Sequence, residues 1–400
     1  MRYDVITVRG GLAGAALARA LALAGMRVLV LERETRFRDR VRGEEMHCWG
    51  VGETRALGIY DLLKSSCARE SRYWSVRVHG MPMVPPRDLV ATSPHRCGTF
   101  SVLHPAMQEV LLEAAAAAGA DVLRGAQVTG VEGGRSPTVR ARIGAGEQIY
   151  AARLVVGADG RDSVCRSMAG FEVERDADGM LVAGVLLDGA AAPDDTTALF
   201  VRPDLGQLAI MVPVAPARTR AYVASAVLKE ARALSGRGRL PAFIGAGIAA
   251  GVPAGWLDRA EAAGPLACFD GSCRWVAHPY RDGVALVGDA AGATDPTFGC
   301  GLSLTLRDGR VLRDRLLEGE DWDAAAHAYA TEHDEYFGAI HRLTGWMRAL
   351  FYDPSEAAAS VRARALPLIA AEPDRRPDIV GLGPAFPSDE TARRRFFGEI

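Results

Sequence analysis

Residues 3–32 read YDVITVRGGLAGAALARALALAGMRVLVLE, and this stretch decides the fold. A run rich in β-branched residues, 3–8, precedes a glycine cluster, and an alanine- and leucine-rich stretch, 12–24, ends at Gly25. A second apolar run, 27–32, follows. The pattern predicts a strand, a helix that a glycine ends, and a second strand. Because both strands are apolar almost throughout, they are typical of a parallel sheet that is covered on both faces.

The turn before the predicted helix has the spacing of a nucleotide-binding loop, Gly-x-Gly-x-x-Gly. In such loops the first glycine permits the tight turn, the second admits a pyrophosphate to the backbone, and the third lets the helix pack closely. Gly11 and Gly14 occupy the second and third places, but Arg9 occupies the first. The helix N-terminus still favours a phosphate, and Glu32 fits an acceptor for ribose hydroxyl groups. The alternative is a helix start on a fold that no longer binds a nucleotide.

Two further segments place unusual residues at turns. Residues 155–163 read VVGADGRDS, in which a strand ends at an Asp-Gly pair that alone is an ordinary turn. Residues 284–292 read VALVGDAAG, and residues 295–301 read DPTFGCG. An acid at a strand end can accept hydrogen bonds from a sugar-like chain, and glycines at a helix start let a flat ring approach backbone N–H groups. The alternative for the last segment is a buried strand followed by a glycine-rich turn.

In this order and spacing, the three segments resemble the motifs of the FAD-dependent aromatic-hydroxylase family, the p-hydroxybenzoate-hydroxylase-like flavoprotein monooxygenases. The resemblance spans roughly residues 3–320. It implies an α/β fold in which a Rossmann-type FAD-binding domain is interrupted by a mostly antiparallel β-sheet substrate domain and followed by C-terminal helices. It also implies FAD as the cofactor and NAD(P)H as a transient reductant, since no second glycine-rich nucleotide loop is visible.

The resemblance assigns roles to individual residues. Glu32 would bind the adenosine ribose, Arg33 would lie near the adenine, and Arg42 would contact the FAD. His104 stands where the family usually has Arg or Gln, which is a departure from the pattern. The motif of Asp159 is linked to both FAD and NAD(P)H. The cofactor-binding residues implied are Gly10, Gly11, Ala13, Gly14, Glu32, Arg33, Arg42, Glu44, His104, Asp159, Asp289, Pro296, Gly299 and Gly301.

The family's reaction follows from the same resemblance. NAD(P)H would reduce FAD, O₂ would give a flavin C4a-hydroperoxide, and its distal oxygen would hydroxylate or epoxidise an aromatic or polyketide-like small molecule. The protein would position the substrate and exclude water. The catalytic candidates are Pro296 and His47, which could act as a base on a phenol, although a lone loop histidine is more often merely hydrogen-bonded. The expected lining residues of the substrate site are Met46, His47, Trp49, Met180, Val182, Met211 and Trp275.

The predicted elements divide the chain into three parts. Strand-like runs such as 207–214 and 220–228 predict an antiparallel sheet in the middle third. The last thirty residues, rich in proline, favour an extended tail over the surface. The expected parts are residues 1–70, 98–178 and 278–320 for the FAD-binding domain, 71–97 and 179–277 for the substrate-binding sheet, and 321–400 for the C-terminal helical segment and tail.

Composition narrows the class of protein. A net charge of −2 over 400 residues gives no global field that favours nucleic acid or an anionic membrane. Seven scattered cysteines lack the spacing of a zinc site or redox pair, so we expect reduced thiols, no metal and a cytoplasmic location. No signal peptide and no apolar stretch of about twenty residues is present. The oligomeric state stays open.

Three other functions remain under consideration. A flavin-dependent halogenase would carry a Trp-x-Trp-x-Ile-Pro signature, and none of the six tryptophans has that spacing. A FAD-dependent oxidoreductase without oxygen insertion is compatible with every motif. A flavin-free, repurposed scaffold is the third alternative, because Arg9 breaks the glycine loop.

Overall fold

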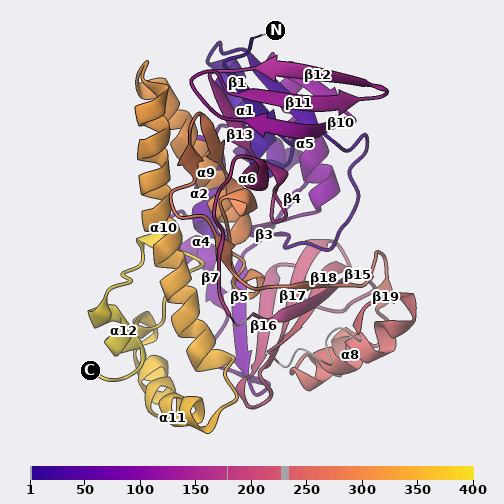
Figure 1. Ribbon diagram of the computed structural model, residues 1–400. Coiled ribbons are helices and arrows are strands. Elements are labelled where there is room, and N and C mark those ends of the chain that lie inside the picture. Colours follow the sequence, from indigo (N-terminus) through magenta and orange to yellow (C-terminus); the bar gives the residue numbers. More distant parts are fainter. Residues whose placement is uncertain (1, 178, 227–233) are drawn as a thin grey trace.

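A six-stranded sheet forms the upper part of the molecule in Figure 1, which shows a computed structural model that describes residues 2–177, 179–226 and 234–400. Its order is β22-β23-β13-β1-β2-β9. The strands pair in parallel except β22, which runs antiparallel to β23. Their bounds are β1 (Val5–Val8), β2 (Val28–Glu32), β9 (Asp121–Arg124), β13 (Leu154–Gly157), β22 (Tyr280–Arg281) and β23 (Val284–Leu286).

Both faces of this sheet are covered, as its apolar strands predict. Val5 of β1 packs into a large core with three helices, whereas its neighbour Ile6 points to a second core beneath a three-stranded antiparallel sheet. This alternation follows from the period of two along a strand. The helices are α1 (Leu12–Leu23), α5 (His104–Ala117) and α9 (Gly301–Glu318), and the covering strands are β10 (Ala126–Glu132), β11 (Thr138–Ile143) and β12 (Gly146–Ala151).

A second, larger sheet forms the lower part of the molecule (Figure 1). Its strands pair antiparallel apart from β16 with β5, and α8 (Leu240–Ala249) packs on one face. Residues 227 and 228 of the predicted run 220–228 lie outside the described residues. The main strands are β5 (Tyr73–Val78), β15 (Leu181–Asp188), β16 (Thr196–Arg202), β17 (Gln207–Ala215) and β18 (Arg218–Ser225), with β6 (Met81–Pro82), β7 (Arg87–Asp88), β19 (Glu261–Ala262) and β20 (Ala267–Asp270) at its edges.

Short elements join the two sheets. The segment between β2 and β5 contributes α2 (Cys48–Ala56), α3 (Tyr60–Ser66) and two strands, β3 (Glu45–Met46) and β4 (Ala68–Ser71), which pair with β8 (Thr99–Val102). A further small sheet contains β14 (Glu174–Arg175), β21 (Arg274–Trp275) and β24 (Gly292–Ala293). The remaining described helices before residue 320 are α4 (Leu89–Thr92) and α6 (Val164–Met168).

The C-terminal part is helical but does not end in a surface tail. The helices are α10 (Trp322–Phe351), α11 (Glu356–Ala371) and α12 (Glu390–Phe396). Between α11 and α12 the chain returns to the body, where Ile379 and Val380 are only 5% and 6% exposed. The expectation of an extended surface tail is therefore wrong, because this apolar pair inserts into the core between the prolines. We call residues 376–380 the inserted segment.

The α/β fold class is confirmed. The three-part division of the chain stays a proposal. The strands of the parallel sheet fall within 5–157 and 280–286, and those of the large sheet within 73–88 and 181–270. Among the described residues, no helix has both the length and the apolar character that a membrane crossing requires.

Candidate active site

Arg9 occupies the left-handed region of backbone conformation, with φ at 83°. Glycine reaches this region without a steric cost, whereas another residue loses roughly 1 kcal/mol there. The turn is tight because a Cβ at Gly14 would lie 2.0 Å from the backbone oxygen of Arg9. The first place of the glycine loop therefore still has the conformation that glycine would adopt, and Arg9 is strained into it.

Glu32, at the end of β2, fixes this loop to the sheet. Its two carboxylate oxygens accept hydrogen bonds from the N–H groups of Gly10 and Glu34, each at 2.7 Å. Arg9 Nη1 lies 3.6 Å from Glu32 Oε1, and Glu32 is only 2% exposed. Arg33 turns away from the loop and pairs with Glu34. The carboxylate thus has a structural role, and Arg9 covers it.

The start of α1 is open to an anion. Gly11 is its N-cap residue, and no described side chain accepts a hydrogen bond from the helix there. A Cβ at Gly11 would have its nearest neighbour, Gln108 Nε2, at 3.6 Å. Ala13 is buried in the helix, and a Cβ at Gly10 would come within 2.6 Å of Leu112. Gly10 and Gly14 are therefore required by packing, whereas the space beside Gly11 is left for a ligand.

Asp159, in the second motif, stabilises the start of a short helix. Its carboxylate accepts hydrogen bonds from Val164 N at 2.7 Å, Cys165 N at 3.1 Å and Ser163 Oγ at 2.5 Å. Gly160 has a φ of 78°, and the exposed Arg42 reaches across to it, with Nη1 3.8 Å from the position of a Cβ. The role of Asp159 in binding FAD or NAD(P)H stays a prediction, because the described contacts of its carboxylate are all local.

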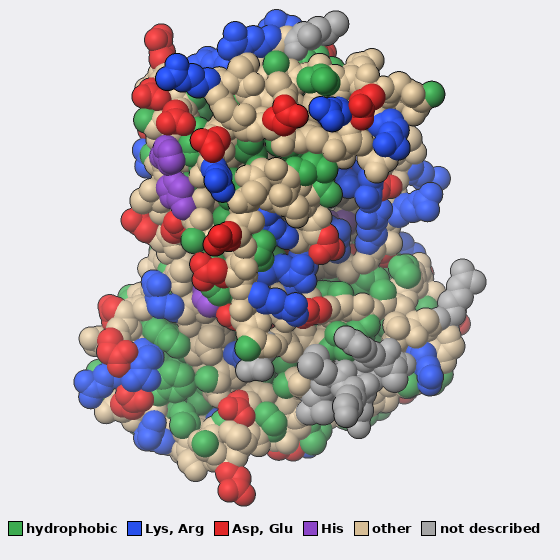
Figure 2. All heavy atoms as spheres, viewed as in Figure 1, with side chains coloured by type: hydrophobic (Ala, Val, Ile, Leu, Met, Phe, Trp, Pro, Cys, Tyr) green, Lys and Arg blue, Asp and Glu red, His purple; other side chains and the backbone are tan. Residues whose placement is uncertain are grey.

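Asp289, in the third motif, lies among arginines. Its carboxylate accepts no hydrogen bond from the described residues. Burial raises its pKa, and the positive charges of nearby arginines oppose this change. A Cβ at Gly301 would lie 3.9 Å from Asp289 Oδ1, so the fold brings these two predicted residues together. Figure 2 shows basic side chains gathered at the waist of the molecule, and those nearest Asp289 are Arg42, Arg161, Arg166 and Arg274.

The loop after β24 is built on Asp295. This fully buried carboxylate accepts hydrogen bonds from Thr297 N at 3.0 Å and Thr297 Oγ1 at 2.7 Å, and Arg348 Nη2 lies 2.8 Å from it. Gly299 takes a φ of 67°, and a Cβ there would lie 2.7 Å from His47 Nε2. The loop therefore needs glycine at 299 for two reasons, its backbone conformation and the imidazole beside it.

His47 is fully buried next to that loop. Its Nδ1 lies 3.0 Å from the carbonyl oxygen of Ile379, and because a carbonyl can only accept, Nδ1 carries the proton. Nε2 is then a lone-pair acceptor, and it has no hydrogen-bond partner in the described part of the chain. Burial lowers the pKa of His47 to about 4. Such an imidazole is a weak proton acceptor, so its role as a general base stays a prediction and not a finding.

Glu44 and His104 hold the segment that carries Arg42. Glu44 Oε2 lies 2.6 Å from Nε of the fully buried Arg220, and it also accepts a hydrogen bond from Tyr222 at 3.1 Å. His104 Nε2 donates to the carbonyl oxygen of Gly43 at 2.6 Å. Burial raises the pKa of Glu44 and lowers that of His104 to about 4. Their contacts are with protein groups, so both residues position the Arg42 segment, and direct contact with a cofactor stays a prediction.

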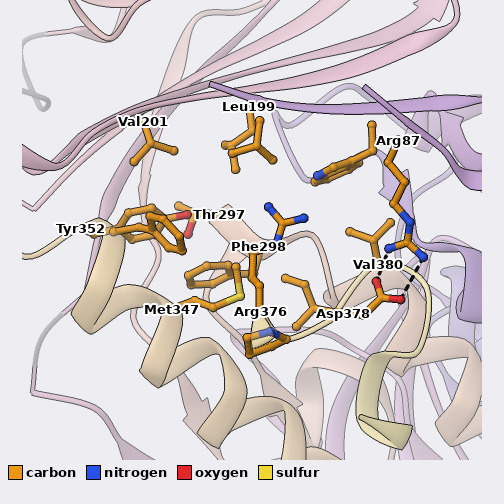
Figure 3. A pocket seen from close by; sticks show the side chains of 15 residues that line it. Arg87, Leu199, Val201, Thr297, Phe298, Met347, Tyr352, Arg376, Asp378 and Val380 are labelled. Carbon is orange, nitrogen blue, oxygen red and sulfur yellow. Dashed lines mark hydrogen bonds and ion pairs between the residues drawn. The ribbon is translucent and has the colours of Figure 1, made fainter. Parts of the chain in front are cut away.

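An apolar cavity lies against the loop after β24 (Figure 3). It is a narrow slot with a volume of about 40 Å³, partly open to solvent, between the large sheet, α10 and the inserted segment. Thr297 and Phe298 line it together with Arg87, Arg376 and Asp378. Its other lining side chains are Trp74, Val76, Leu199, Val201, Met347, Phe351, Tyr352, Pro377, Ile379 and Val380.

None of the seven side chains expected around the substrate lines this cavity. Met211 lies on the face of the large sheet that packs on α8, and Trp275 packs against Phe337 and His341 of α10. His47 comes nearest, with its ring edge-on to Trp74 at 5.7 Å between centroids. The expected substrate lining stays a prediction, because the cavity is made where distant segments meet and its lining alone does not identify where a substrate binds.

The buried polar atoms around Asp289 fit a ligand rich in phosphate and hydroxyl groups. Arg161 Nε, Arg274 Nε and Thr294 Oγ1 are buried, and no described residue bonds to any of them. Buried polar groups without partners are uncommon in native proteins. Together with the open start of α1 and the His47 Nε2 acceptor, they supply the kinds of donors and acceptors that a dinucleotide needs. The residues present therefore fit FAD.

The comparison with known families agrees with this chemistry. A family model described as FAD binding domain matches residues 2–336. The chain belongs to this FAD-binding family. It is a flavin-dependent enzyme of the oxidoreductase class, and the resemblance to the aromatic-hydroxylase group is confirmed.

Three curated relatives of this FAD-binding enzyme come from Streptomyces. Rifampicin monooxygenase of Streptomyces venezuelae is 28% identical over 345 residues, which are 83% of this chain and 68% of that protein. The 6-methylpretetramide 4-monooxygenase of Streptomyces rimosus is 27% identical, over 79% of this chain and 75% of the relative. Dialkyldecalin synthase of Streptomyces rugosporus is 29% identical, over 87% and 72%.

A solved structure gives the same fold. p-Nitrophenol 4-monooxygenase from Pseudomonas putida superposes with a TM-score of 0.79 at 20% identity, covering 100% of this chain and 97% of the other. At this identity the likeness concerns the fold alone. It places the FAD-binding enzyme in an architecture shared with monooxygenases.

One group of side chains has the composition of a metal site. Asp176, Cys273 and His341 bring their ligand atoms within 4.8 Å of one another. However, His341 Nε2 already pairs with Asp176 at 3.0 Å, and burial raises the pKa of Cys273 to about 12. A protonated thiol is a poor ligand. The absence of a metal cofactor stays a prediction for this FAD-binding enzyme.

Proposed function

We propose that this enzyme is a FAD-dependent monooxygenase that uses NAD(P)H and O₂ to hydroxylate or epoxidise an aromatic or polyketide-like small molecule. One observation supports the substrate site most directly: Thr297 and Phe298 line the apolar cavity and belong to the same loop as Pro296, Gly299 and Gly301. A ligand in the cavity would therefore lie against the loop that would line the isoalloxazine. The names of the rifampicin and 6-methylpretetramide monooxygenases support the same class of reaction.

Different residues of the chain would bind different parts of the cofactor. The start of α1 at Gly11 would receive the pyrophosphate, and Glu32 would receive the ribose once Arg9 moves aside. Asp289 and Arg42 would bind the ribityl and pyrophosphate region. Reduced FAD supplies the chemistry that activates O₂ when it is bound. The apolar lining of the cavity would exclude water from the reacting groups, which protects a reactive oxygen species from breakdown.

A location in the cytoplasm is part of this proposal. NAD(P)H is available there, and reduced thiols are the rule in that compartment. No pair of cysteines within the described ranges forms a disulfide. This observation agrees with the proposal and does not by itself decide it.

The deciding experiment follows the oxygen atom. Purified protein loaded with FAD would be supplied with NADPH or NADH, ¹⁸O₂ and 1-naphthol as a neutral aromatic probe, and with 1-hydroxy-2-naphthoate in parallel. We expect reductant consumption to rise with the probe and one ¹⁸O atom to appear in the product by mass spectrometry. Consumption that yields only hydrogen peroxide with every probe would argue against oxygen insertion.

A second candidate has one specific observation in its favour. Dialkyldecalin synthase covers 87% of this chain, and its name describes the formation of a ring system and not an oxygenation. An enzyme of that kind would convert its substrate without O₂. Anaerobic incubation with FAD separates the two functions, since a monooxygenase would release no product under those conditions.

A further inference from the structure

Three charged side chains reach the apolar cavity, and one of them has no partner among the residues that the structure describes. Arg87 and Asp378 form a two-pronged ion pair, with Nη1–Oδ1 at 2.6 Å and Nη2–Oδ2 at 3.0 Å. Arg376 extends its guanidinium group from the inserted segment into the cavity (Figure 3). None of the described residues forms a hydrogen bond or an ion pair with that group. Since Arg87 and Asp378 neutralise each other, Arg376 leaves the cavity with one uncompensated positive charge.

This position is costly for a cation. Arg376 is half-buried, and the side chains beside it include Phe298, Met347 and Leu199. Burial lowers the pKa of Arg376, and only the charge of Asp378 works against this effect. An uncompensated charge near apolar groups is rarely kept unless it has a partner in the working state of the protein. No described residue supplies such a partner, and an anionic group on a ligand in the cavity would supply one.

The chemistry of the guanidinium group limits the classes of ligand that it would bind. Its planar array of N–H donors matches two oxygens that share a negative charge, and such charge-assisted pairs are stronger than neutral hydrogen bonds. The rest of the cavity offers aromatic surfaces, including Trp74 and Phe298. An aromatic molecule with one anionic group would satisfy both parts of the lining.

We propose that Arg376 selects a substrate that is aromatic and carries an ionised oxygen, either a carboxylate or an acidic enol. The proposal rests on the proposed function, because it takes the cavity as the substrate site. The guanidinium group would hold the anionic end at the inserted segment, while the rings lie along the Phe298 side of the cavity. Arg376 is then a residue that determines specificity for the anionic class of substrate.

Paired ligands test the charge directly. The carboxylate probe is 1-hydroxy-2-naphthoate, with its uncharged carboxamide as the control, and the enolate probe is 4-hydroxycoumarin, with 4-methoxycoumarin as the control. Isothermal titration of the FAD-loaded protein gives each dissociation constant. We expect Arg376→Met to weaken binding of the anions about ten- to hundred-fold and to change binding of the neutral controls little. The anion that loses more identifies carboxylate or enolate as the preferred group.

Two further variants separate charge from structure. Arg376→Lys keeps the charge without the planar fork, so we expect it to bind the anions with intermediate affinity. Arg394→Met removes one exposed positive charge from the same end of the chain, outside the cavity, and should bind like the wild type. Because Arg376 has no described partner to lose, Arg376→Met should melt no lower than the wild type. Anions should raise the melting temperature of the wild type and not of this variant.

The outcomes separate this inference from the proposed function. Equal binding of each anion and its neutral control, or equal weakening of both by Arg376→Met, would overturn the role of Arg376. If ¹⁸O enters neutral 1-naphthol as readily as the naphthoate, and the variant does not change this, the monooxygenase stands and the selection of anions is wrong. If anion binding depends on Arg376 but no ¹⁸O is incorporated with any probe, the inference stands and the oxygenase is wrong. Should Arg376→Met fail to fold, Arg376→Gln replaces it in the same assays.

Discussion

The guanidinium group of Arg9 lies over the carboxylate of Glu32, with Nη1 3.6 Å from Oε1. The two residues meet because Arg9 occupies the turn at the end of β1 and Glu32 ends the neighbouring strand β2. This pair is the main departure of the chain from a nucleotide-binding loop. The ion pair adds a contact that holds the glycine turn. It also covers Glu32, the carboxylate that would bind a ribose.

Two substitutions at residue 9 isolate the strain of the turn. Arg9→Ala and Arg9→Gly both remove the ion pair, but only glycine accepts a φ of 83° without a steric cost. We expect Arg9→Gly to exceed Arg9→Ala in free energy of unfolding by about 1 kcal/mol, measured by urea denaturation without FAD. FAD should bind Arg9→Gly at least as tightly as the wild type, because Glu32 is uncovered. A large loss of FAD affinity in Arg9→Gly would instead mean that Arg9 contacts the phosphates.

Substitution of Gly11 and of Gly14 by alanine should affect different properties. A Cβ at Gly14 would clash with the backbone oxygen of Arg9 at 2.0 Å, whereas a Cβ at Gly11 has only Gln108 near it, at 3.6 Å. We expect Gly14→Ala to lower the free energy of unfolding by about 3 kcal/mol or more. Gly11→Ala should unfold like the wild type but bind FAD on the order of ten-fold more weakly, because a methyl group stands where the pyrophosphate approaches. Urea denaturation and flavin fluorescence titration measure the two effects, and a Gly11→Ala protein with unchanged FAD affinity would exclude the pyrophosphate from this position.

Glu45 should make stability depend on pH. Its buried carboxyl accepts hydrogen bonds from Thr99 at 2.8 Å and Thr197 at 2.5 Å, and no cation of the described chain pairs with it. Burial raises its pKa to about 7. The folded state then holds a proton that the unfolded state has lost, so this group's contribution to stability falls as pH rises from about 4.5 to about 7. Glu45→Gln keeps both hydrogen bonds and removes the titration. It should match the wild type at pH 5 and be more stable by about 2 kcal/mol at pH 8.

The comparison of Glu45→Gln with the wild type is needed because other buried groups titrate in the opposite direction. His47 and His104 have lowered pKa values, so their contribution to stability is lost as pH falls from about 6.5 to about 4. Both histidines are present in either protein, and their effect cancels in the difference. Parallel stability profiles for the two proteins between pH 5 and 8 would show that Glu45 keeps an ordinary pKa.

His47 should remain neutral over the working pH range. Its ring is fully buried, and its pKa is lowered to about 4. We expect the ¹³C-labelled imidazole of His47 to show no titration between pH 5.5 and 8 by NMR, with His47→Gln used to assign its signal. A pH profile of turnover with a midpoint near 6.5 would then have another origin. Titration of the His47 signal near that midpoint would restore its role as a general base.

Much of the fold could be predicted from the sequence because its signals are local. The strand, glycine turn and helix of residues 3–32 are encoded by periodicity within thirty residues, and they form β1, α1 and β2 within one or two residues of the expected bounds. The meeting of Asp289 and Gly301 follows from the same local signals. Asp289 stands at the end of a strand, and Gly301 stands at the start of a helix that the motif specifies.

The apolar cavity could not be predicted in this way. Trp74, Leu199, Phe298, Met347 and Arg376 meet only because the large sheet, the loop after β24, a long helix and the inserted segment pack together. No spacing in the sequence relates these positions. The bond between His47 and Ile379 joins residues 332 positions apart, and an apolar pair between prolines gave no sign that it would enter the core. The unpaired charge of Arg376 becomes visible only when its surroundings are known.

The inserted segment gives the enzyme an order of assembly during synthesis. Every strand of the parallel sheet has been synthesised by residue 286, whereas the wall that carries Arg376 and Asp378 is among the last parts to be made. A nascent chain can thus complete its nucleotide-binding layer before the last wall of the neighbouring apolar cavity has been made. A fragment that stops before residue 376 would keep every strand of that layer and lack Arg376, the residue proposed to select the substrate.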